Sequence, residues 1–538
     1  MNQPTATNDA PMADICLLLE GTWPYVRGGV SSWVNQLILG LPELTFSVVF
    51  IGGKREAYPH RRYDIPANVV HVEELYIEES WQPHGRSSKR PKRNAPRDQL
   101  LSLYRFLHHP DAPGESAGEA LVASLAGGKL DLDDVLHSRE NWDIVTDGYY
   151  THCSDPSFID FFWTLRSIQA PLVMLAQAAR QLPKARVLHS ISTGYAGLLG
   201  CILKRLWGCE YVLSEHGIYT KERKIDLAQA SWIGEDARTA ASGGIDSGTG
   251  YIRSLWIRYF ERIGLLTYRS ASPIISLYAG NRQRQIKDGA DPTRTRIIPN
   301  GIDLEGWSDA LATRGAGIAP VVGFIGRVVP IKDLKTFIRA IRGVVSAMPE
   351  AEAWIVGPED EDPSYAAECH SLVASLGLEN KVRFLGFQNI QEILPQLGVM
   401  VLTSISEAQP LVILEAWCAG TPVVSSDVGS CRELIEGGTR DDQALGPAGE
   451  VVAIADPQAT ARAILDLLMD PIRWQAAQAS GLARVKRYYG EALMFACYLE
   501  IYYAAMENTE WLVSASNYEK SSPETPTLQR LEPMSMRD

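Results

Sequence analysis

The sequence has no long apolar run and no excess of basic charge. None of its apolar segments reaches the ~18 residues that span a bilayer, and no basic segment precedes the first apolar stretch as in a secretory signal. The formal net charge is −13, which argues against nucleic acid because neutralising phosphates needs a basic surface. We therefore expect a cytoplasmic protein, or one held peripherally at the inner membrane, with no nucleic-acid partner.

Cysteine patterns that bind metal or form disulfides are also missing. The eight cysteines form no Cys-x-x-Cys pair, and several lie in apolar runs such as LLGCILKRLWG and LEAWCAG. This is typical of buried free thiols in a reducing compartment. The chain also lacks a cluster at metal-ligand spacing, a Gly-x-Ser-x-Gly element and a Walker lysine motif. We expect no metal site.

Two series of strands and helices follow one another in the remaining sequence. At 538 residues the chain is too long for one core. Buried strands such as ADICLLLEG and FSVVFIGG alternate with amphipathic helices, and six more strands, from VVGFIG to EVVAIAD, repeat the pattern later. This alternation predicts an α/β fold made of two Rossmann-like, doubly wound domains that face each other across a cleft.

The predicted boundaries follow changes in composition. The first domain covers 12–312 and carries an insertion at about 78–147, and the second covers 318–490. A last helix over 491–512 is expected to pack back on the first domain. Residues 1–11 are predicted to be flexible and 514–538 disordered. The basic run HGRSSKRPKRNAPR is either a solvated loop or a dock for anionic lipid or an acidic partner.

Two cations flank the turn after VVGFIG. Arg327 lies at the end of this strand, and Lys332 lies just before a helix that begins near Asp333. Fixed positive charge beside a helix N-terminus predicts an anion site suited to a diphosphate. The alternative is an exposed Arg and Lys on a loop. In the first domain, Gly28 and Gly29 let a ligand approach the amides at the start of a helix, or they form a plain tight turn.

Two acids lie eight positions apart in SISEAQPLVILEAWCAGTPVVSSDVGS. Glu407 follows a buried strand, Pro410 suits the first turn of a helix, and Glu415 falls near the same helix face, up to about 12 Å away along the axis. The acids can bind hydroxyls at the two ends of an extended ligand such as a sugar nucleotide. Alternatively, Glu407 only favours the helix start, but apolar neighbours mean that Glu415 needs partners.

Two histidines end predicted strands of the first domain. His216 precedes a Gly turn and could hydrogen-bond a sugar or polarise a leaving group, and His189 is a weaker candidate. Either residue could instead be structural. Ser430 and Glu433 have the spacing of a capping box, which predicts a structural role at a helix start.

These motifs together resemble the retaining family 4 glycosyltransferases of the GT-B fold. The resemblance rests on GGV, IIPNGID, GRVVPIKD and the Glu-x7-Glu element, and it covers most of the chain. The segments LLLEGTWPYVRGGVSSWVNQLI and SEHGIYTKER look like the PelF branch, which is associated with Pel exopolysaccharide synthesis.

The resemblance implies metal-independent, retaining transfer from a UDP-sugar co-substrate, UDP-glucose or a relative, to a carbohydrate acceptor on the first domain. An inner-membrane polysaccharide synthase or export complex is the implied protein partner. His216 and Glu407 would be the catalytic residues, with Glu407 on the donor sugar's hydroxyls. The implied donor-binding residues are Gly28, Gly29, Arg327, Lys332, Ala408, Gln409, Pro410, Leu411 and Glu415.

One departure from the family lies after the first glutamate. Many relatives have Gly-Phe there, whereas this chain has Ala408 and Gln409, so Gln409 is expected to influence sugar choice. Two alternatives stay open, a UDP-sugar epimerase and a non-catalytic sugar-nucleotide-binding scaffold of a membrane assembly. A dehydrogenase is disfavoured because no dinucleotide fingerprint follows the first strand.

Overall fold

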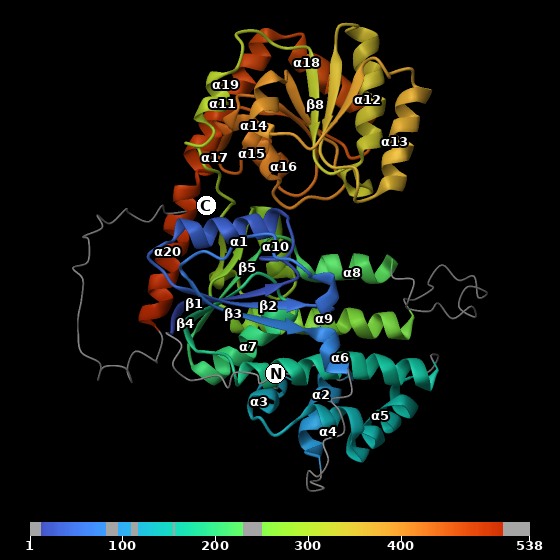
Figure 1. Ribbon diagram of the computed structural model, residues 1–538, viewed down its shortest axis with the longest axis vertical. Helices are drawn as coiled ribbons and strands as arrows, with labels where there is room; N and C mark the ends of the chain where they lie inside the picture. The colour runs from blue at the N-terminus through green and yellow to red at the C-terminus, as the bar shows by residue number, and fades with distance from the viewer. Residues whose placement is uncertain (1–11, 82–94, 109–116, 154–156, 230–249, 509–538) are drawn as a thin grey trace.

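The computed structural model describes residues 12–81, 95–108, 117–153, 157–229 and 250–508. The predictions for 1–11, for most of the basic run and for 514–538 lie outside these residues. The described chain forms two Rossmann-like α/β domains stacked one above the other (Figure 1), as the sequence predicts. Within the described part, no helix has the length and apolar character to cross a bilayer.

Each domain is built on one parallel sheet. The N-terminal sheet has the order β3-β2-β1-β4-β5-β6-β7, and the C-terminal sheet has the order β10-β9-β8-β11-β12-β13. The strands are β1 Ala13–Glu20, β2 Phe46–Gly52, β3 Val69–Tyr76, β4 Ala185–Ser190, β5 Glu210–Glu215, β6 Ile274–Ser276, β7 Thr295–Ile297, β8 Val321–Ile325, β9 Glu352–Val356, β10 Val382–Gly386, β11 Val399–Leu402, β12 Val423–Ser426 and β13 Gly449–Val452. Central strands are apolar on both faces because helices cover both sides of each sheet.

Helices α1 to α10 belong to the N-terminal domain. Figure 1 shows α1 on the side nearer the C-terminal domain and α2 to α5 on the opposite side. The bounds are α1 Gly29–Gly40, α2 Arg97–His108, α3 Ala117–Ala126, α4 Leu132–His137, α5 Arg139–His152, α6 Phe158–Ala179, α7 Tyr195–Trp207, α8 Tyr219–Gln229, α9 Tyr251–Ser270 and α10 Ala279–Lys287. The insertion predicted at 78–147 is therefore helical where it is described, and α6 extends this helical region beyond the predicted end.

The remaining helices cover the C-terminal sheet and return to the first domain. They are α11 Ser308–Ala312, α12 Leu334–Ala347, α13 Pro363–Ser375, α14 Ile390–Ile393, α15 Leu411–Cys418, α16 Cys431–Glu436, α17 Arg440–Gln443, α18 Pro457–Leu468, α19 Pro471–Tyr488 and α20 Glu491–Glu507. Ile302, Trp307 and Ala310 pack in a core cluster of the C-terminal domain. The assignment of 302–312 to the first domain is therefore wrong, because these apolar side chains are buried against the second.

The two chain crossings between the domains are bonded to each other. The Ile302 amide donates to Tyr489 O at 2.8 Å, and the Glu491 amide donates to Ile302 O at 2.9 Å. Gly301 allows this approach, because a Cβ there would lie 2.4 Å from the Glu491 Cα. Both connections therefore meet at one point between the domains.

Helix α20 docks on the N-terminal sheet through polar contacts in an apolar core. The His189 ring contacts Tyr502 Oη at 2.6 Å through Nδ1 and Ser214 Oγ at 2.8 Å through Nε2. Tyr498 Oη lies 2.9 Å from the same Ser214 Oγ. Burial lowers the pKa of His189 to about 3, so the ring is neutral. His189, the weaker histidine candidate, is a core residue that holds α20.

Replacing Tyr502 with phenylalanine tests whether the His189 contact stabilises the packing of α20 on the sheet. The change leaves His189 Nδ1 buried without its partner, so we expect the free energy of unfolding to fall by about 1–2 kcal/mol. Urea unfolding followed by tryptophan fluorescence measures the change. Tyr503→Phe is the matched control, because Tyr503 is 46% exposed. Equal stabilities of the two variants would contradict the assigned role of the His189 contact.

Candidate active site

The order of the C-terminal sheet reverses around β8, which lies between β9 and β11. Ligands of doubly wound sheets bind beyond the carboxyl ends of the strands at such a point. The chain leaves β8 through Arg327 and Lys332, and it leaves β11 through Glu407. The topology therefore brings these three predicted site residues to one edge of the sheet.

Lys332 and Glu407 form a direct ion pair there. Lys332 Nζ lies 2.5 Å from Glu407 Oε1, and the two side chains are 20% and 13% exposed. Thr403 Oγ1 donates to the carbonyl oxygens of Lys332 and Asp333 at 3.1 and 3.0 Å, which ties the two loops together. Asp333 has a φ of 45° and accepts a hydrogen bond from the Thr336 amide at the start of α12. Lys332 is thus fixed beside a helix N-terminus, as predicted.

Arg327 has a different partner. Its Nη1 lies 2.5 Å from Glu361 Oε1, and both side chains are about half exposed. Exposed pairs of this kind contribute little stability because solvent screens them. The sequence predicts that Arg327 and Lys332 act on one diphosphate, whereas the structure pairs each cation with its own acid. Arg327 can leave its pair at small cost.

Glu415 lies in α15, which begins at Leu411 as predicted, with Pro410 at the N-cap. Among the described residues the Glu415 carboxylate has no hydrogen-bond or ion-pair partner. Burial raises the pKa of Glu415 to about 7. A desolvated carboxyl group without a described partner is suited to hydrogen-bond ligand hydroxyls.

The loop before α15 is braced by its neighbours. Ala408 O accepts from the Ser430 amide at 2.8 Å, and Gln409 Oε1 accepts from the Asn300 amide at 2.6 Å. Gln409 is buried in this contact with the first domain. Its side-chain oxygen binds the backbone of the IIPNGID segment, and an influence of Gln409 on sugar choice stays a prediction.

The predicted capping box at Ser430 and Glu433 is wrong. The Ser430 side chain makes no capping hydrogen bond at the start of α16, and its Oγ is buried without a partner among the described residues. Glu433 instead accepts from the Ala279 amide of the first domain at 3.1 Å. The glutamate therefore caps α10 across the domain boundary, where the helix dipole favours a negative charge.

His216 lies on the opposite side of this boundary, directly after β5. Its ring packs edge-on against Trp33, with centroids 4.5 Å apart, and its Nε2 is buried without a described partner. Burial lowers the pKa of His216 to about 4, so the ring is neutral near pH 7. Asn281 Nδ2 donates to His216 O at 3.2 Å, which links His216 through α10 to Glu433.

A cavity of about 500 Å³ opens beside His216 at the carboxyl ends of β1, β2, β4 and β5. It is lined by Glu20, Gly21, Thr22, Val30, Ile51, Gly52, Gly53, Tyr58, Ile77, Glu78, Ile191, Ser192, Tyr195, His216, Gly217, Tyr219, Glu222 and Arg223. All of these residues belong to the N-terminal domain. The lining of this cavity includes none of Lys332, Glu407 and Glu415. Gly28 and Gly29 lie exposed at the start of α1, directly before the lining residue Val30.

The sequence reasoning missed one of the acids that line this cavity. Glu20 ends β1, and Glu20 Oε1 accepts a hydrogen bond from Tyr219 Oη at 2.6 Å. The signal that singled out His216, a polar residue at the carboxyl end of a buried strand, also applies to Glu20. Within the described ranges, no group of three or more His, Cys, Asp or Glu side chains is arranged to hold a metal ion.

Comparisons with known proteins agree with this architecture. The structure of Anabaena Alr3699/HepE in complex with UDP and glucose aligns with a TM-score of 0.53 at 18% identity, over 91% of this chain and 99% of that one. Sucrose-phosphate synthase from Thermosynechococcus elongatus aligns with a TM-score of 0.53 at 16% identity, over 91% and 100%. These likenesses establish a GT-B fold.

Sequence relatives give the class of enzyme. Alpha-maltose-1-phosphate synthase of Mycolicibacterium smegmatis is 28% identical over 375 residues, 66% of this chain and 87% of that protein. D-inositol 3-phosphate glycosyltransferase 2 of Catenulispora acidiphila is 28% identical over 52% of this chain and 61% of its own length. Residues 319–470 match the model described as Glycosyl transferases group 1. The fold and these matches define a glycosyltransferase of the hexosyltransferase class.

The N-terminal half of the chain matches a second family model. Residues 13–293 match the model described as Domain of unknown function (DUF3492). The chain belongs to this family. In this chain, the DUF3492 region is followed by the region that matches the group 1 glycosyltransferase model.

The raised pKa of Glu415 predicts a pH-dependent stability. A carboxyl group with a pKa of about 7 in the folded protein and about 4.5 in the unfolded chain binds more protons when folded. Its contribution to stability is therefore present below pH 4.5 and is lost as the pH rises to 7, by at most about 3 kcal/mol. Glu415→Gln removes this titration.

Urea unfolding of wild type and Glu415→Gln between pH 5 and 8 measures the effect. We expect the variant to gain stability relative to wild type as the pH rises through this window. Taking the difference between the two proteins cancels every other titrating group. Parallel stability curves would show that Glu415 ionises normally and has a partner.

Proposed function

We propose that the chain transfers a sugar, with retention of anomeric configuration and without a metal, from a UDP-sugar to a saccharide acceptor. The donor would be UDP-glucose or a relative. The observation that carries the proposal is the Lys332–Glu407 ion pair at the switch point of the C-terminal sheet. It lies next to a helix that carries an acid without a described partner, Glu415.

In this proposal the donor's diphosphate binds Lys332 and the first amides of α15, which begins at Leu411. Negative charge grows on the diphosphate as the glycosidic bond breaks, and fixed positive groups stabilise it. Arg327 adds a second cation by leaving its exposed pair with Glu361. Glu415 accepts hydrogen bonds from the ribose hydroxyls. Ala408 and Pro410 contribute backbone that shapes the sugar site.

Glu407 binds the hydroxyls of the donor sugar rather than attacking its anomeric carbon. Its Oε1 is held 2.5 Å from the Lys332 ammonium, which lowers the nucleophilicity of the carboxylate. A reaction in which the acceptor enters on the leaving-group side needs no enzyme nucleophile and retains the configuration. His216, neutral near pH 7, hydrogen-bonds the sugar or the acceptor through Nε2.

Two observations support UDP as the nucleotide of the donor and polysaccharide synthesis as the process. Alr3699/HepE, which shares the fold, has been crystallised with UDP, with UDP-glucose, and with UDP and glucose. The N-terminal segments GTWPYVRGGVSS and SEHGIYTKER look like the branch associated with Pel exopolysaccharide synthesis. We therefore propose that the acceptor is a growing polysaccharide. The chain would act in the cytoplasm, in association with an inner-membrane synthase or export complex.

A donor screen tests the proposal. We expect UDP-sugars, but not GDP- or ADP-sugars, to raise the melting temperature of the protein, because a ligand stabilises the fold that binds it. We also expect UDP release to need a saccharide acceptor. Interconversion of UDP-sugars without an acceptor would identify an epimerase, and UDP binding without any turnover would identify a scaffold.

Single substitutions separate binding from turnover. Lys332→Ala and Glu415→Ala should each weaken UDP-sugar binding about tenfold or more, because each removes charged hydrogen bonds to the donor. His216→Ala should lower kcat more than it raises KM. Calorimetry and steady-state kinetics measure both quantities. Arg383→Ala, which removes an exposed cation on the edge strand β10, is the control. Three site variants indistinguishable from Arg383→Ala would refute the assignment.

A further inference from the structure

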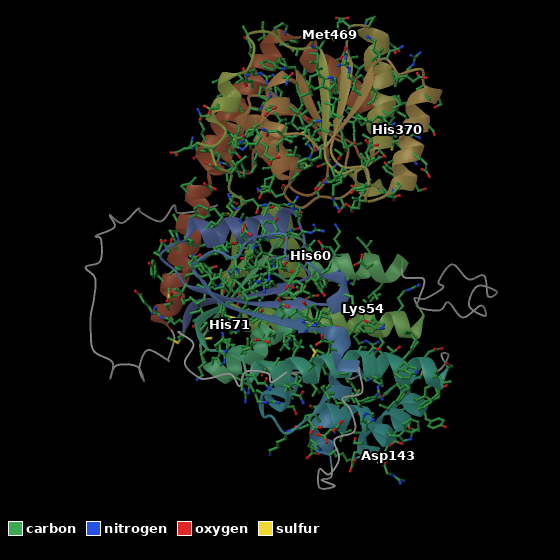
Figure 2. The ribbon with its side chains drawn as sticks, in the orientation of Figure 1. Lys54, His60, His71, Asp143, His370 and Met469 are labelled. Carbon is green, nitrogen blue, oxygen red and sulfur yellow. The ribbon has the colours of Figure 1, made fainter. Side chains whose placement is uncertain are left out.

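The cavity beside His216 has an acidic lining. Three carboxylates, from Glu20, Glu78 and Glu222, line it with one guanidinium, from Arg223. Glu78 is paired with Lys54 at 3.3 Å, and Figure 2 labels Lys54 on the N-terminal domain, in the half nearer the C-terminal domain. Arg223 is paired with Asp226 at 3.1 Å. Arg223 also attracts Glu20 and Glu222, so this one cation is shared among three acids and the cavity stays acidic.

Glu20 and Glu222 are both placed to act on a ligand. Glu20 accepts hydrogen bonds from neutral donors, chiefly Tyr219 Oη at 2.6 Å, and it forms no ion pair within the described residues. The Glu222 carboxylate lies over Gly217, where a Cβ would be 2.0 Å from Glu222 Oε1. Since Gly217 follows His216 directly, the charge of Glu222 lies beside the proposed reaction centre.

The rest of the lining is suited to a sugar ring. Thr22 Oγ1 and His216 Nε2 are buried and have no partner among the described residues, so a ligand hydroxyl can satisfy them. Tyr58, Tyr195 and Tyr219 add aromatic surface to the same lining, on which the apolar faces of a saccharide pack. The volume of about 500 Å³ falls within the usual range of small-molecule sites.

We propose that this cavity selects an acceptor saccharide without negative charge and rejects phosphorylated or carboxylated sugars, through the charges of Glu20 and Glu222. The inference rests on the proposed glycosyl transfer and specifies its acceptor. An anionic sugar placed here meets more acids than cations in the lining, which is unfavourable. Two of the relatives, by contrast, are named for a phosphorylated sugar and a phosphorylated cyclitol.

Paired acceptors test the inference. The probes are neutral disaccharides of glucose, galactose and N-acetylglucosamine, each beside the same sugar carrying a phosphate or a carboxylate. UDP release from the donor found in the screen gives kcat/KM for each acceptor. We expect the neutral member of every accepted pair to be preferred by about tenfold or more.

Charge-removing variants assign the selectivity to the two acids. Glu222→Gln and Glu20→Gln should each reduce the preference for the neutral sugar by roughly 3- to 30-fold. Glu222 is exposed, so its substitution should leave the fold intact. Glutamine at position 20 keeps an oxygen for the Tyr219 hydroxyl. Asp143→Asn makes the same charge change on α5, far from the C-terminal domain (Figure 2), and should leave the preference unchanged.

The outcomes separate this inference from the proposed function. If no UDP-sugar stabilises the wild type, the proposed function fails and this inference fails with it. If donor binding and transfer occur but anionic acceptors match neutral ones, only the inference is overturned. Unchanged selectivity in both glutamine variants would also overturn it.

Discussion

The ion pair between Lys332 and Glu407 is the contact on which the proposed donor site depends. It joins the loops that leave β8 and β11, the two neighbouring strands at the switch point of the C-terminal sheet. Both side chains are mostly shielded, so removing either one would leave an uncompensated charge. The pair therefore fixes a cation at the start of α12 and an acid ahead of α15.

The two sides of the domain boundary differ in charge. The C-terminal side presents cations that are each paired with an acid, whereas the acids that line the N-terminal cavity outnumber its one cation, Arg223. Two contacts align these sides: Gln409 with the Asn300 amide, and Glu433 with the Ala279 amide at the start of α10. Because α10 also holds the backbone of His216 through Asn281, the position of His216 depends on how the domains meet.

The local sequence pattern was sufficient to predict the long buried strands and the residues at which α1 and α15 begin. It was insufficient for β6 and β7, which have three residues each, because so short a run has no readable period. The capping box failed for a related reason. Spacing alone makes Ser430 and Glu433 a local pair, but the Ala279 amide across the boundary offers Glu433 an unpaired helix N-terminus.

The sequence by itself determined that two parallel sheets form, and that Arg327, Lys332, Glu407 and His216 lie where strands end. The pattern of apolar residues predicts both the sheets and these positions. A parallel strand is buried on two faces, so its polar residues lie only at its ends. The tertiary structure alone decided the partners. It paired Lys332 with Glu407 and Arg327 with Glu361, and it brought Glu20 and Glu222 to one cavity, because charge pairing depends on distances between segments far apart in the chain.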